Sequence, residues 1–365
     1  MSANGPQLFS PMTLRGVTLR NRIGVSPMCQ YSSENGFAHD WHLVHLGQFA
    51  VGGAALVFTE ATAVVAEGRI SPQDLGIWDD EHIPMLQRIT HFIEAQGAVP
   101  GIQLAHAGRK SSTKRPWDGS GTITPEHGGW TEVMAPSAIA FSESYPEPQA
   151  LTIGGIARVI DAFRDATLRA ITAGFRVIEL HAAHGYLIHE FLSPLSNHRT
   201  DSYGGSLENR ARLCLETVAA VRSVLPDSTP LVVRISATDW ADGGWNIEES
   251  VQLCSWLKAA AVDLIDVSSG GLVSGVRIPL GPGYQVPFAK QIRDGADIPT
   301  ATVGLITDAQ QAEGIVSRGA ADMVLLAREL LRQPHWPLLA AHALGSSFPW
   351  PPQYERAHPS GPPKR

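Results

Sequence analysis

The sequence has few cysteines, few charged residues and no long apolar run. Its three cysteines, Cys29, Cys214 and Cys254, lie far apart without a C-x-x-C pair, so neither a disulfide framework nor an iron–sulfur site is expected. No apolar stretch approaches the roughly 20 residues of a membrane span. The N-terminal stretch lacks the basic start and apolar core of a secretory signal. We therefore expect a cytoplasmic protein.

Charge is scarce as well: 17% of the 365 residues are charged, and the formal net charge is −7. Because no basic field is present to gather phosphates, we expect no nucleic-acid partner and a small-molecule substrate instead. Hydrophobic residues make up 44% of the chain, which is enough to bury the core of one barrel domain or of two smaller domains.

Short apolar runs that end in small or polar residues recur along the chain. They occupy residues 23–28, 55–61, 100–108, 175–185, 231–237, 263–271, 300–304 and 322–328. Such runs are typical of parallel strands that are buried on both faces. Segments of helical periodicity separate most of them. These eight strands alternating with helices predict a closed (β/α)8 barrel, with an open doubly wound sheet as the alternative.

Local signals predict several helix ends. The helical segments 80–97 and 156–174 each end in a glycine, which is a common C-terminal cap. Thr307 and Gln310 form a T-x-x-Q capping box, which predicts that a later helix begins at Thr307.

Two segments exceed a minimal barrel. Residues 110–150 are rich in Gly, Pro, Ser and Trp, and predict a long loop after the third strand that lies over the catalytic face. The C-terminal segment is proline-rich, so we expect no element of its own there and docking elsewhere, on another subunit. We divide the chain into a barrel, residues 1–345, and a tail, residues 346–365.

Polar residues follow the first, third, fourth and fifth apolar runs. Because functional groups of barrel enzymes lie at the C-terminal ends of the strands, these residues should converge on one cavity. They are Ser26, Met28, Cys29, Tyr31, Gln103, His106, His181, His184, Tyr186 and Arg234.

The histidines allow more than one interpretation. His181 and His184 form H-x-x-H, which could bind a metal, but no third ligand lies nearby in the sequence. Two imidazoles beside Tyr186 suit a carbonyl oxygen that develops negative charge and a phenol that delivers a proton. They could equally satisfy buried backbone groups. His39, His42 and His45 lack acidic or cysteine partners at ligand spacing, and we interpret them as helix-surface or packing residues. Cys29 is either a small buried side chain or a cofactor contact.

A phosphate site is expected late in a barrel. Gly304 follows the seventh run and allows close backbone approach, and Arg328 follows the eighth and can clamp phosphate oxygens. There is no G-x-G-x-x-G after a strand and no Walker loop, so a separate dinucleotide domain is not expected. A nicotinamide would therefore use the same cavity as the substrate.

Over almost its whole length the chain resembles the Old Yellow Enzyme flavoproteins, and within them the bacterial YqjM-like and xenobiotic reductase A-like ene-reductases. The resemblance is carried by LRNRIGVSPMCQYS, GIQLAHAGRK, IELHAAHGYLIHEFLSPLSNHRTDSYGGSLENR, TVGLIT, AREL and QYER. It implies tightly but non-covalently bound FMN at the barrel mouth, with NADPH or NADH as the hydride donor. It also implies a homodimer or homotetramer.

The resemblance also implies roles for individual residues. Ser26, Pro27, Met28 and Cys29 would line the flavin, with Ala61 and Gln103 at its pyrimidine edge. Arg234 would lie beside flavin N1 and O2, and Gly304 and Arg328 would hold the phosphate. Ala327 departs from the glycine that relatives often carry there, and its methyl group would crowd the phosphate loop slightly.

By the same resemblance, the protein reduces the C=C bond of enones, maleimides, quinones or nitro compounds by a ping-pong mechanism. His181 and His184 would bind the carbonyl oxygen, hydride would pass from flavin N5 to Cβ, and Tyr186 would protonate Cα. Cys29 and Tyr31 would touch the substrate, and Arg356 would reach a neighbouring subunit's site.

Three other classes remain to be weighed. Dienoyl-CoA reductases carry an iron–sulfur cluster and a further domain, for which this chain lacks the cysteines and the length. A barrel aldolase or isomerase would need a lysine or carboxylate at a strand end, and only Lys110 comes near one. A non-catalytic flavin sensor would not need His181, His184 and Tyr186 together.

Overall fold

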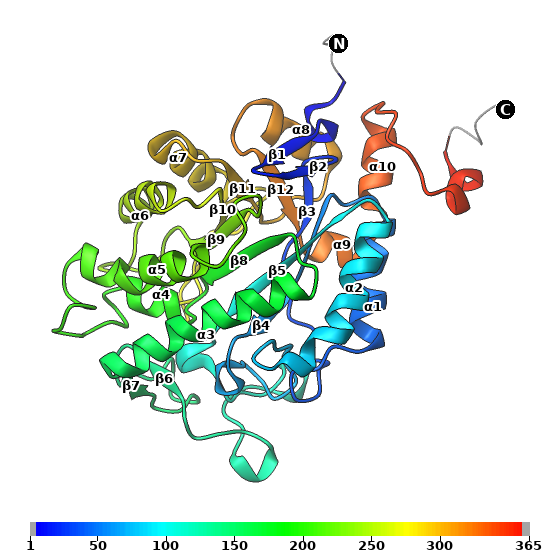
Figure 1. Cartoon of the computed structure of the whole chain (residues 1–365). Coiled ribbons are helices and arrows are strands. Elements are labelled where there is room, and N and C mark those ends of the chain that lie inside the picture. Colours follow the sequence, from blue (N-terminus) through cyan, green and yellow to red (C-terminus); the bar gives the residue numbers. More distant parts are fainter. Residues whose placement is uncertain (1–4, 360–365) are drawn as a thin grey trace.

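The computed structural model describes residues 5–359, and its centre is a closed barrel of eight parallel strands (Figure 1). The strands are paired in the order β10-β11-β12-β3-β4-β5-β8-β9. The predicted (β/α)8 barrel is confirmed, because each of the eight apolar runs contributes one strand. Their bounds are β3 Ile23–Val25, β4 Leu56–Ala63, β5 Val99–Ala105, β8 Val177–Ala182, β9 Leu231–Ser236, β10 Leu264–Ser268, β11 Thr300–Thr302 and β12 Met323–Leu326.

Helices surround the barrel and cover the outer faces of its strands (Figure 1). They are α1 Asp40–Val51, α2 Ile83–Ala95, α3 Ile153–Thr172, α4 Leu187–Leu192, α5 Leu207–Arg222, α6 Ile247–Ala259, α7 Val286–Ala296, α8 Ala309–Ser317, α9 Arg328–Arg332 and α10 Trp336–Ala343. Among residues 5–359, no helix is long and apolar enough to cross a membrane.

The interior of the barrel changes from apolar to polar along the strands. Strand register places Gln103 beside Glu179 and His181 beside Arg234, and Arg234 lies beside Asp266. Because alternate residues of a strand share a face, apolar residues such as Val177 precede these groups on the same inner face. The polar side chains therefore lie toward the C-terminal ends of the strands.

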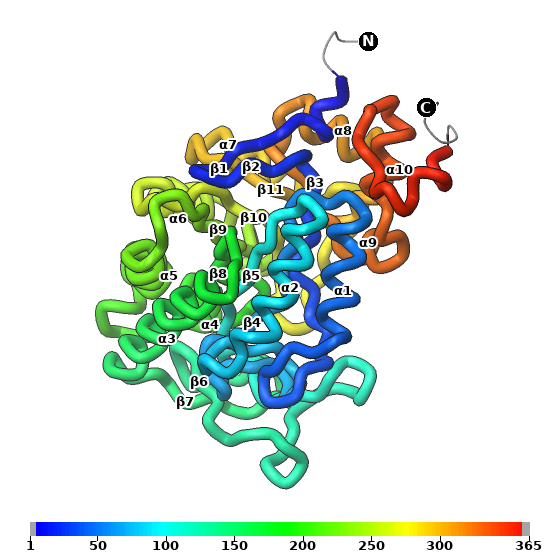
Figure 2. Tube along the Cα trace, turned by 45° about the vertical axis from the view of Figure 1, so that its right-hand side comes forward, coloured from blue at the N-terminus to red at the C-terminus, as the bar shows by residue number. Residues whose placement is uncertain are grey.

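A hairpin closes the opposite end of the barrel. Strands β1 Met12–Leu14 and β2 Val17–Leu19 are antiparallel. Their buried side chains, including Leu14 and Leu19, form one cluster with barrel residues such as Phe58. Figures 1 and 2 show this hairpin at one end and the segment around β6 and β7 at the other. The apolar end of the barrel is thus sealed by its own N-terminal segment.

The predicted glycine caps are confirmed, but the predicted capping box is wrong. Gly97 and Gly174 follow α2 and α3 with φ values of 73° and 88°, which suit glycine. Helix α8 is capped by Asp308, not by Thr307. The Asp308 carboxylate accepts hydrogen bonds from the backbone N–H groups of Gln310 and Gln311. Asp308 is one residue closer to the helix than Thr307, and its carboxylate already accepts from the free N–H groups of the first turn. The hydroxyl of Thr307 therefore has no such group left to cap.

The long loop contains only short elements, and the tail contains one that was not expected. Residues 110–150 include the strands β6 Met134–Ala135 and β7 Gln149–Ala150. The tail forms η7, Pro352–Ala357, so the prediction that it has no element of its own is wrong. Pro352 occupies the first turn, where its missing N–H costs nothing, and the ring of Tyr354 packs on that of His335 with 5.4 Å between centroids.

The remaining short 3-10 helices lie in the connections. They are η1 Gln7–Phe9, η2 Ala66–Gly68, η3 Asp80–His82, η4 Gly108–Lys110, η5 Pro116–Asp118 and η6 Pro125–His127.

Candidate functional site

A cavity of about 230 Å³ opens at the C-terminal ends of β3 and of β9 to β12. Five residues predicted from the sequence line it: Ser26, Pro27, Arg234, Gly304 and Arg328. Its other lining residues include Ser268, Tyr284, Gln285, Ala327 and Arg332. The strand ends therefore bring together residues that are 300 positions apart in the chain.

Guanidinium groups give this cavity a positive character. Arg234 is buried, and its Nε lies 3.1 Å from Oδ2 of Asp266. Arg328 makes no hydrogen bond or ion pair within residues 5–359, while Arg332 is paired with Glu329 at 2.5 Å. An uncompensated guanidinium at the edge of a cavity is suited to an anion such as a phosphate.

Gly304 occupies a backbone conformation that keeps this part of the cavity open. Its φ is 122°, and a Cβ built on it would lie 2.8 Å from the Tyr284 ring and 2.9 Å from the Gln285 amide nitrogen. A larger residue would therefore be strained and would narrow the site. Ala327, by contrast, has a negative φ of −110°, so its backbone is not in the left-handed region that favours glycine.

A layer of buried acids lies beneath the cavity. The amide of Gln103 donates to Oε1 of Glu179 at 2.7 Å, and Asp266 lies next to Arg234. Burial, and then the nearby Asp266, raise the pKa of Glu179; burial also raises the pKa of Asp266. Neither oxygen of Asp266 has a hydrogen-bond partner, so the Arg234 cation is its main compensation.

His181, near the end of β8, forms one cluster with His184 and Tyr186 on the turn that follows the strand. The ring centroids of His181 and His184 are 5.2 Å apart, and those of His181 and Tyr186 are 5.0 Å apart. Burial, and then the positive charge of Arg234, lower the pKa of both imidazoles, which are therefore neutral. Burial, and then Cys29, raise the pKa of Tyr186, so its phenol keeps its proton. The cluster consequently offers neutral donors at neutral pH.

Hydrogen bonds fix how the two imidazoles are presented. Nδ1 of His181 accepts from the backbone N–H of Ala183 at 3.3 Å, so the proton of this neutral ring is on Nε2. Nε2 of His184 lies 2.7 Å from the hydroxyl of Ser268, which also lines the cavity. The histidine cluster and the cavity are therefore parts of one site.

Cys29 and Tyr31 come close to the same cluster. Their side chains share a hydrogen bond, and burial raises the pKa of both groups. Tyr31 has a φ of 49°, which turns the chain after β3. Ala61 and Tyr186 line a second, much smaller cavity next to this cluster. The arrangement places a neutral thiol and two neutral phenols around one space.

Other predicted residues lie elsewhere. Met28 is half-buried and packs against the core. His106 is buried and accepts from the N–H of Gly108, and burial lowers its pKa to about 4. His42 and His45 are both buried on α1, but Nε2 of His42 lies 3.3 Å from Oε1 of Glu60, so His42 has an acidic partner that its sequence neighbours do not reveal. Arg356 is exposed on η7, which lies beside α10 and away from the loop end of the barrel (Figures 1 and 2).

Sequence reasoning missed Lys110, Ser268 and Gln285. Lys110 lies several positions beyond its strand, yet its ammonium donates to the carbonyls of His184 and Gly271. Burial lowers the pKa of Lys110 to about 7. Ser268 could have been found, since it ends the sixth apolar run, whereas no sequence signal marks Gln285.

Within the described part of the chain, no group of three or more His, Cys, Asp or Glu residues is arranged to hold a metal ion.

A family model described as the NADH:flavin oxidoreductase / NADH oxidase family matches residues 7–346. The chain belongs to this family. It is an oxidoreductase whose cofactors are FMN and a reduced nicotinamide, and the resemblance to the Old Yellow Enzyme flavoproteins is confirmed.

Two curated relatives illustrate the similarity. The chain is 50% identical over 351 residues to an NADPH dehydrogenase of Geobacillus thermodenitrificans (strain NG80-2), covering 96% of this chain and 98% of that protein. It is 49% identical over 353 residues to an NADPH dehydrogenase of Listeria innocua serovar 6a, covering 96% and 99%.

Solved structures share the fold. Morphinone reductase superposes with a TM-score of 0.78 at 26% identity, over 95% of this chain and 92% of that one. A 2-naphthoyl-CoA reductase gives a TM-score of 0.83 at 25% identity over 93% of this chain. This chain spans only 52% of that longer protein.

The residues of the site fit FMN. Arg328 has no hydrogen-bond or ion-pair partner among residues 5–359, Gly304 leaves space that a Cβ would fill, and Arg234 places a cation beside the same cavity. These are the features that a phosphate and an electron-accepting ring require.

Proposed function

We propose that the protein is an ene-reductase that reduces the C=C bond of α,β-unsaturated carbonyl compounds with electrons from NADPH or NADH. The observation that carries the proposal is the cluster of His181, His184 and Tyr186, which lies directly beside a cavity that suits FMN. Neutral imidazoles and a protonated phenol are the groups that a polarised carbonyl and a developing carbanion need.

The proposed FMN site uses the residues that resemblance and geometry assign together. Gly304 and Arg328 would hold the phosphate, and Arg234 would lie next to the ring system, where negative charge gathers on reduction. The remaining contacts would come from Ser26, Pro27, Met28, Cys29, Ala61 and Gln103. The chemistry that bound FMN supplies is hydride transfer between a reduced nicotinamide and the β-carbon of the alkene.

The side chains of the protein would bind and protonate the substrate. The Nε2–H of His181 and the ring of His184 would donate hydrogen bonds to the carbonyl oxygen, together with the hydroxyl of Tyr31. Tyr186 would deliver the proton of its Oη to Cα, because its raised pKa keeps this proton in place until a carbanion demands it. Cys29 would touch both the flavin and the substrate.

The tail would complete the site of another copy. Arg356 is exposed on η7 and makes no hydrogen bond or ion pair within the described residues, and it lies far from the mouth of its own barrel (Figure 1). We propose that the tail, residues 346–365, reaches from the barrel of residues 1–345 to a neighbouring subunit in a cytoplasmic homodimer or homotetramer; its last six residues, 360–365, lie outside the described part of the chain. Arg356→Ala should weaken substrate binding without altering FMN content, as measured by the KM for enone and by flavin absorbance.

The central test is anaerobic stopped-flow absorbance. The flavin band should bleach on mixing with NADPH and return on mixing with 2-cyclohexenone. A protein that bleaches but is not reoxidised by the enone would overturn the choice of substrate.

Variants test the residue roles. Tyr186→Phe should slow reoxidation by 2-cyclohexenone by about 100-fold and leave reduction by NADPH unchanged, because only alkene reduction requires its proton. His181→Ala should weaken the binding of a phenol or enone, measured as a shift of the flavin spectrum. If both variants reduced enones at the wild-type rate, the assigned roles would be wrong.

A further inference from the structure

The turn that carries His184 and Tyr186 has an unusual backbone. His184 and Gly185 have φ values of 60° and 70°, so two consecutive residues are left-handed. Gly185 also packs against the backbone of Gly271, and a Cβ there would collide with the Gly271 carbonyl. A backbone of this kind persists only where its surroundings hold it in place.

Because the chain reverses at this point, the backbone N–H of Gly185 has no partner in a strand or helix. It donates instead to Nδ1 of His189 at 2.9 Å. A ring nitrogen that accepts carries no proton, so the imidazole proton is on Nε2. Nε2 of His189 lies 2.9 Å from Oδ1 of Asp239, so the imidazole and the carboxylate form a close buried pair.

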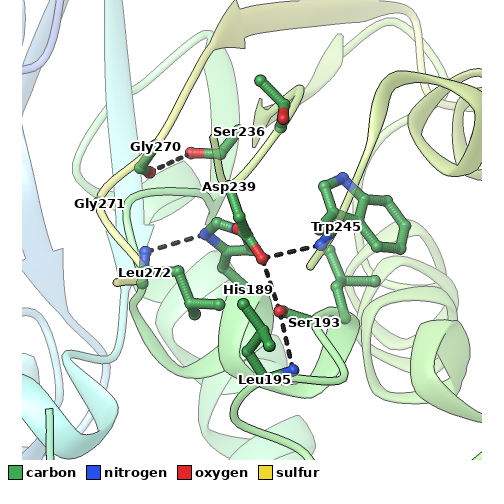
Figure 3. Close-up of polar contacts among 12 residues, drawn as sticks. His189, Ser193, Leu195, Ser236, Asp239, Trp245, Gly270, Gly271 and Leu272 are labelled. Carbon is green, nitrogen blue, oxygen red and sulfur yellow. Dashed lines mark hydrogen bonds and ion pairs between the residues drawn. The ribbon is translucent and has the colours of Figure 1, made fainter. Parts of the chain in front are cut away.

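Asp239 is itself held on its other oxygen. Its Oδ2 accepts from the hydroxyl of Ser193 at 2.6 Å and from the backbone N–H of Trp245 at 2.8 Å. Burial disfavours its charge, but the hydrogen bonds and charge of its neighbours, His189 foremost, outweigh this and lower its pKa. Figure 3 shows His189 beside Asp239, and dashed lines connect the Asp239 carboxylate to Ser193 and Trp245.

This network is rigid and is outside the substrate cavity. The side chains of His189 and Asp239 are both 0% exposed. A second bond supports the same turn, since the N–H of His184 donates to the hydroxyl of Ser236, which in turn donates to the carbonyl of Gly270. His189 is on α4 and Asp239 follows β9, so the pair joins the two loops that flank the turn.

We infer that His189 and Asp239 are positioning residues that fix the turn and thereby aim Tyr186 at the substrate. They act through the Gly185 N–H and touch neither substrate nor cofactor. The inference rests on the proposed role of Tyr186. A displacement of a reacting group by about 1 Å can greatly lower the rate of the step in which that group takes part. Loosening this turn should therefore slow the protonation of the alkene by Tyr186 and leave the other steps unchanged.

Three variants test the inference in the FMN-loaded protein. His189→Leu removes the hydrogen bond with Gly185 and the pairing with Asp239, and should slow reoxidation by 2-cyclohexenone by about tenfold or more. His189→Gln can accept from Gly185 and donate to Asp239, and should restore the rate to within about threefold of the wild type. Asp239→Asn places an NH2 group where the carboxylate now faces hydrogen-bond donors such as the Ser193 hydroxyl and the Trp245 N–H. It should also slow reoxidation by 2-cyclohexenone.

The readout separates positioning from general damage. Reoxidation of the reduced flavin by molecular oxygen requires no proton from Tyr186, so it should stay unchanged in all three variants. Thr90→Val is the matched control, because it removes a buried hydrogen bond to the carbonyl of Ala173 and contacts no member of this network. Its rate with the enone should equal that of the wild type.

Each outcome is decisive. Wild-type enone rates in FMN-loaded His189→Leu would overturn the inference, and so would equal losses with enone and oxygen that glutamine does not rescue. If His189→Leu did not fold, His189→Gln and Asp239→Asn would still provide the test. A normal enone rate in Tyr186→Phe would instead refute the proposed function, independently of His189.

Discussion

Replacement of Arg234 by methionine should destabilise the protein because it strands a buried carboxylate. Asp266 is fully buried, neither of its oxygens has a hydrogen-bond partner, and Arg234 lies 3.1 Å away. Removing one partner of a buried ion pair costs about 3 to 5 kcal/mol. For a chain of 365 residues, a loss of this size corresponds to a fall in melting temperature of about 4 to 6 °C.

A second substitution checks the cause. Arg234→Met combined with Asp266→Asn removes both charges, and it should recover most of the lost stability without restoring FMN affinity. The two substitutions are therefore expected to be strongly non-additive. Arg234→Lys keeps the cation and should lose less stability than Arg234→Met.

The assay is urea unfolding of the FMN-free protein followed by circular dichroism, at pH 5 and at pH 8, so that differences in FMN binding do not contribute to the measured stability. Loss of the cation raises the folded-state pKa of Asp266 further, so the folded protein binds a proton that the unfolded chain releases. Stability then falls as pH rises, and the deficit of Arg234→Met should be smaller at pH 5 than at pH 8. If the double variant were as unstable as the single one, the stranded charge would not be the cause.

Three further predictions follow from local geometry. Gly304→Val should weaken FMN binding by about tenfold or more in a fluorescence-quenching titration, because its Cβ would meet a tyrosine ring at 2.8 Å, whereas Gly243→Ala, with no atom near, should not. Burial lowers the pKa of Lys110 to about 7, so the folded protein releases this proton more readily than the unfolded chain. The free energy of unfolding of the wild type, compared with that of Lys110→Met, should therefore rise between pH 7 and pH 10 in urea unfolding. If this difference did not change with pH, the burial of the ammonium would be contradicted. Asp308→Ala should destabilise the protein by about 1 kcal/mol and Thr307→Ala by much less; the reverse order would restore the predicted capping box.

The barrel could be predicted because its strands are buried on both faces and leave continuous apolar runs. The polar residues that end these runs, such as Ser26, His181 and Arg234, could also be placed at one end, since parallel strands share their direction. Their roles could not be obtained this way. H-x-x-H alone is compatible with a metal site or a structural pair, and the roles of His181 and His184 came from family resemblance.

What the sequence could not reveal depends on contacts between distant segments. Lys110 counts as remote from its strand along the chain, but the turn η4 brings its ammonium back to the carbonyl of His184. His189 and Asp239 are 50 residues apart in sequence and meet only because β8 and β9 are neighbours. Thr307 and Asp308 are neighbours, and both are residue types that cap helices. A sequence pattern does not fix the first residue of a helix to within one position, so it could not decide between them.

The β1–β2 hairpin gives the barrel a single entrance. Its leucines fill the apolar end, so whatever enters at the mouth must leave there, and two ligands that need the same floor cannot pass each other. Excess enone would then delay entry of the nicotinamide, and excess nicotinamide would delay the enone. If the nicotinamide and the proposed enone bind at the same place, the enzyme should show mutual competitive inhibition by its two substrates, because the closed end of the barrel offers neither of them a second route.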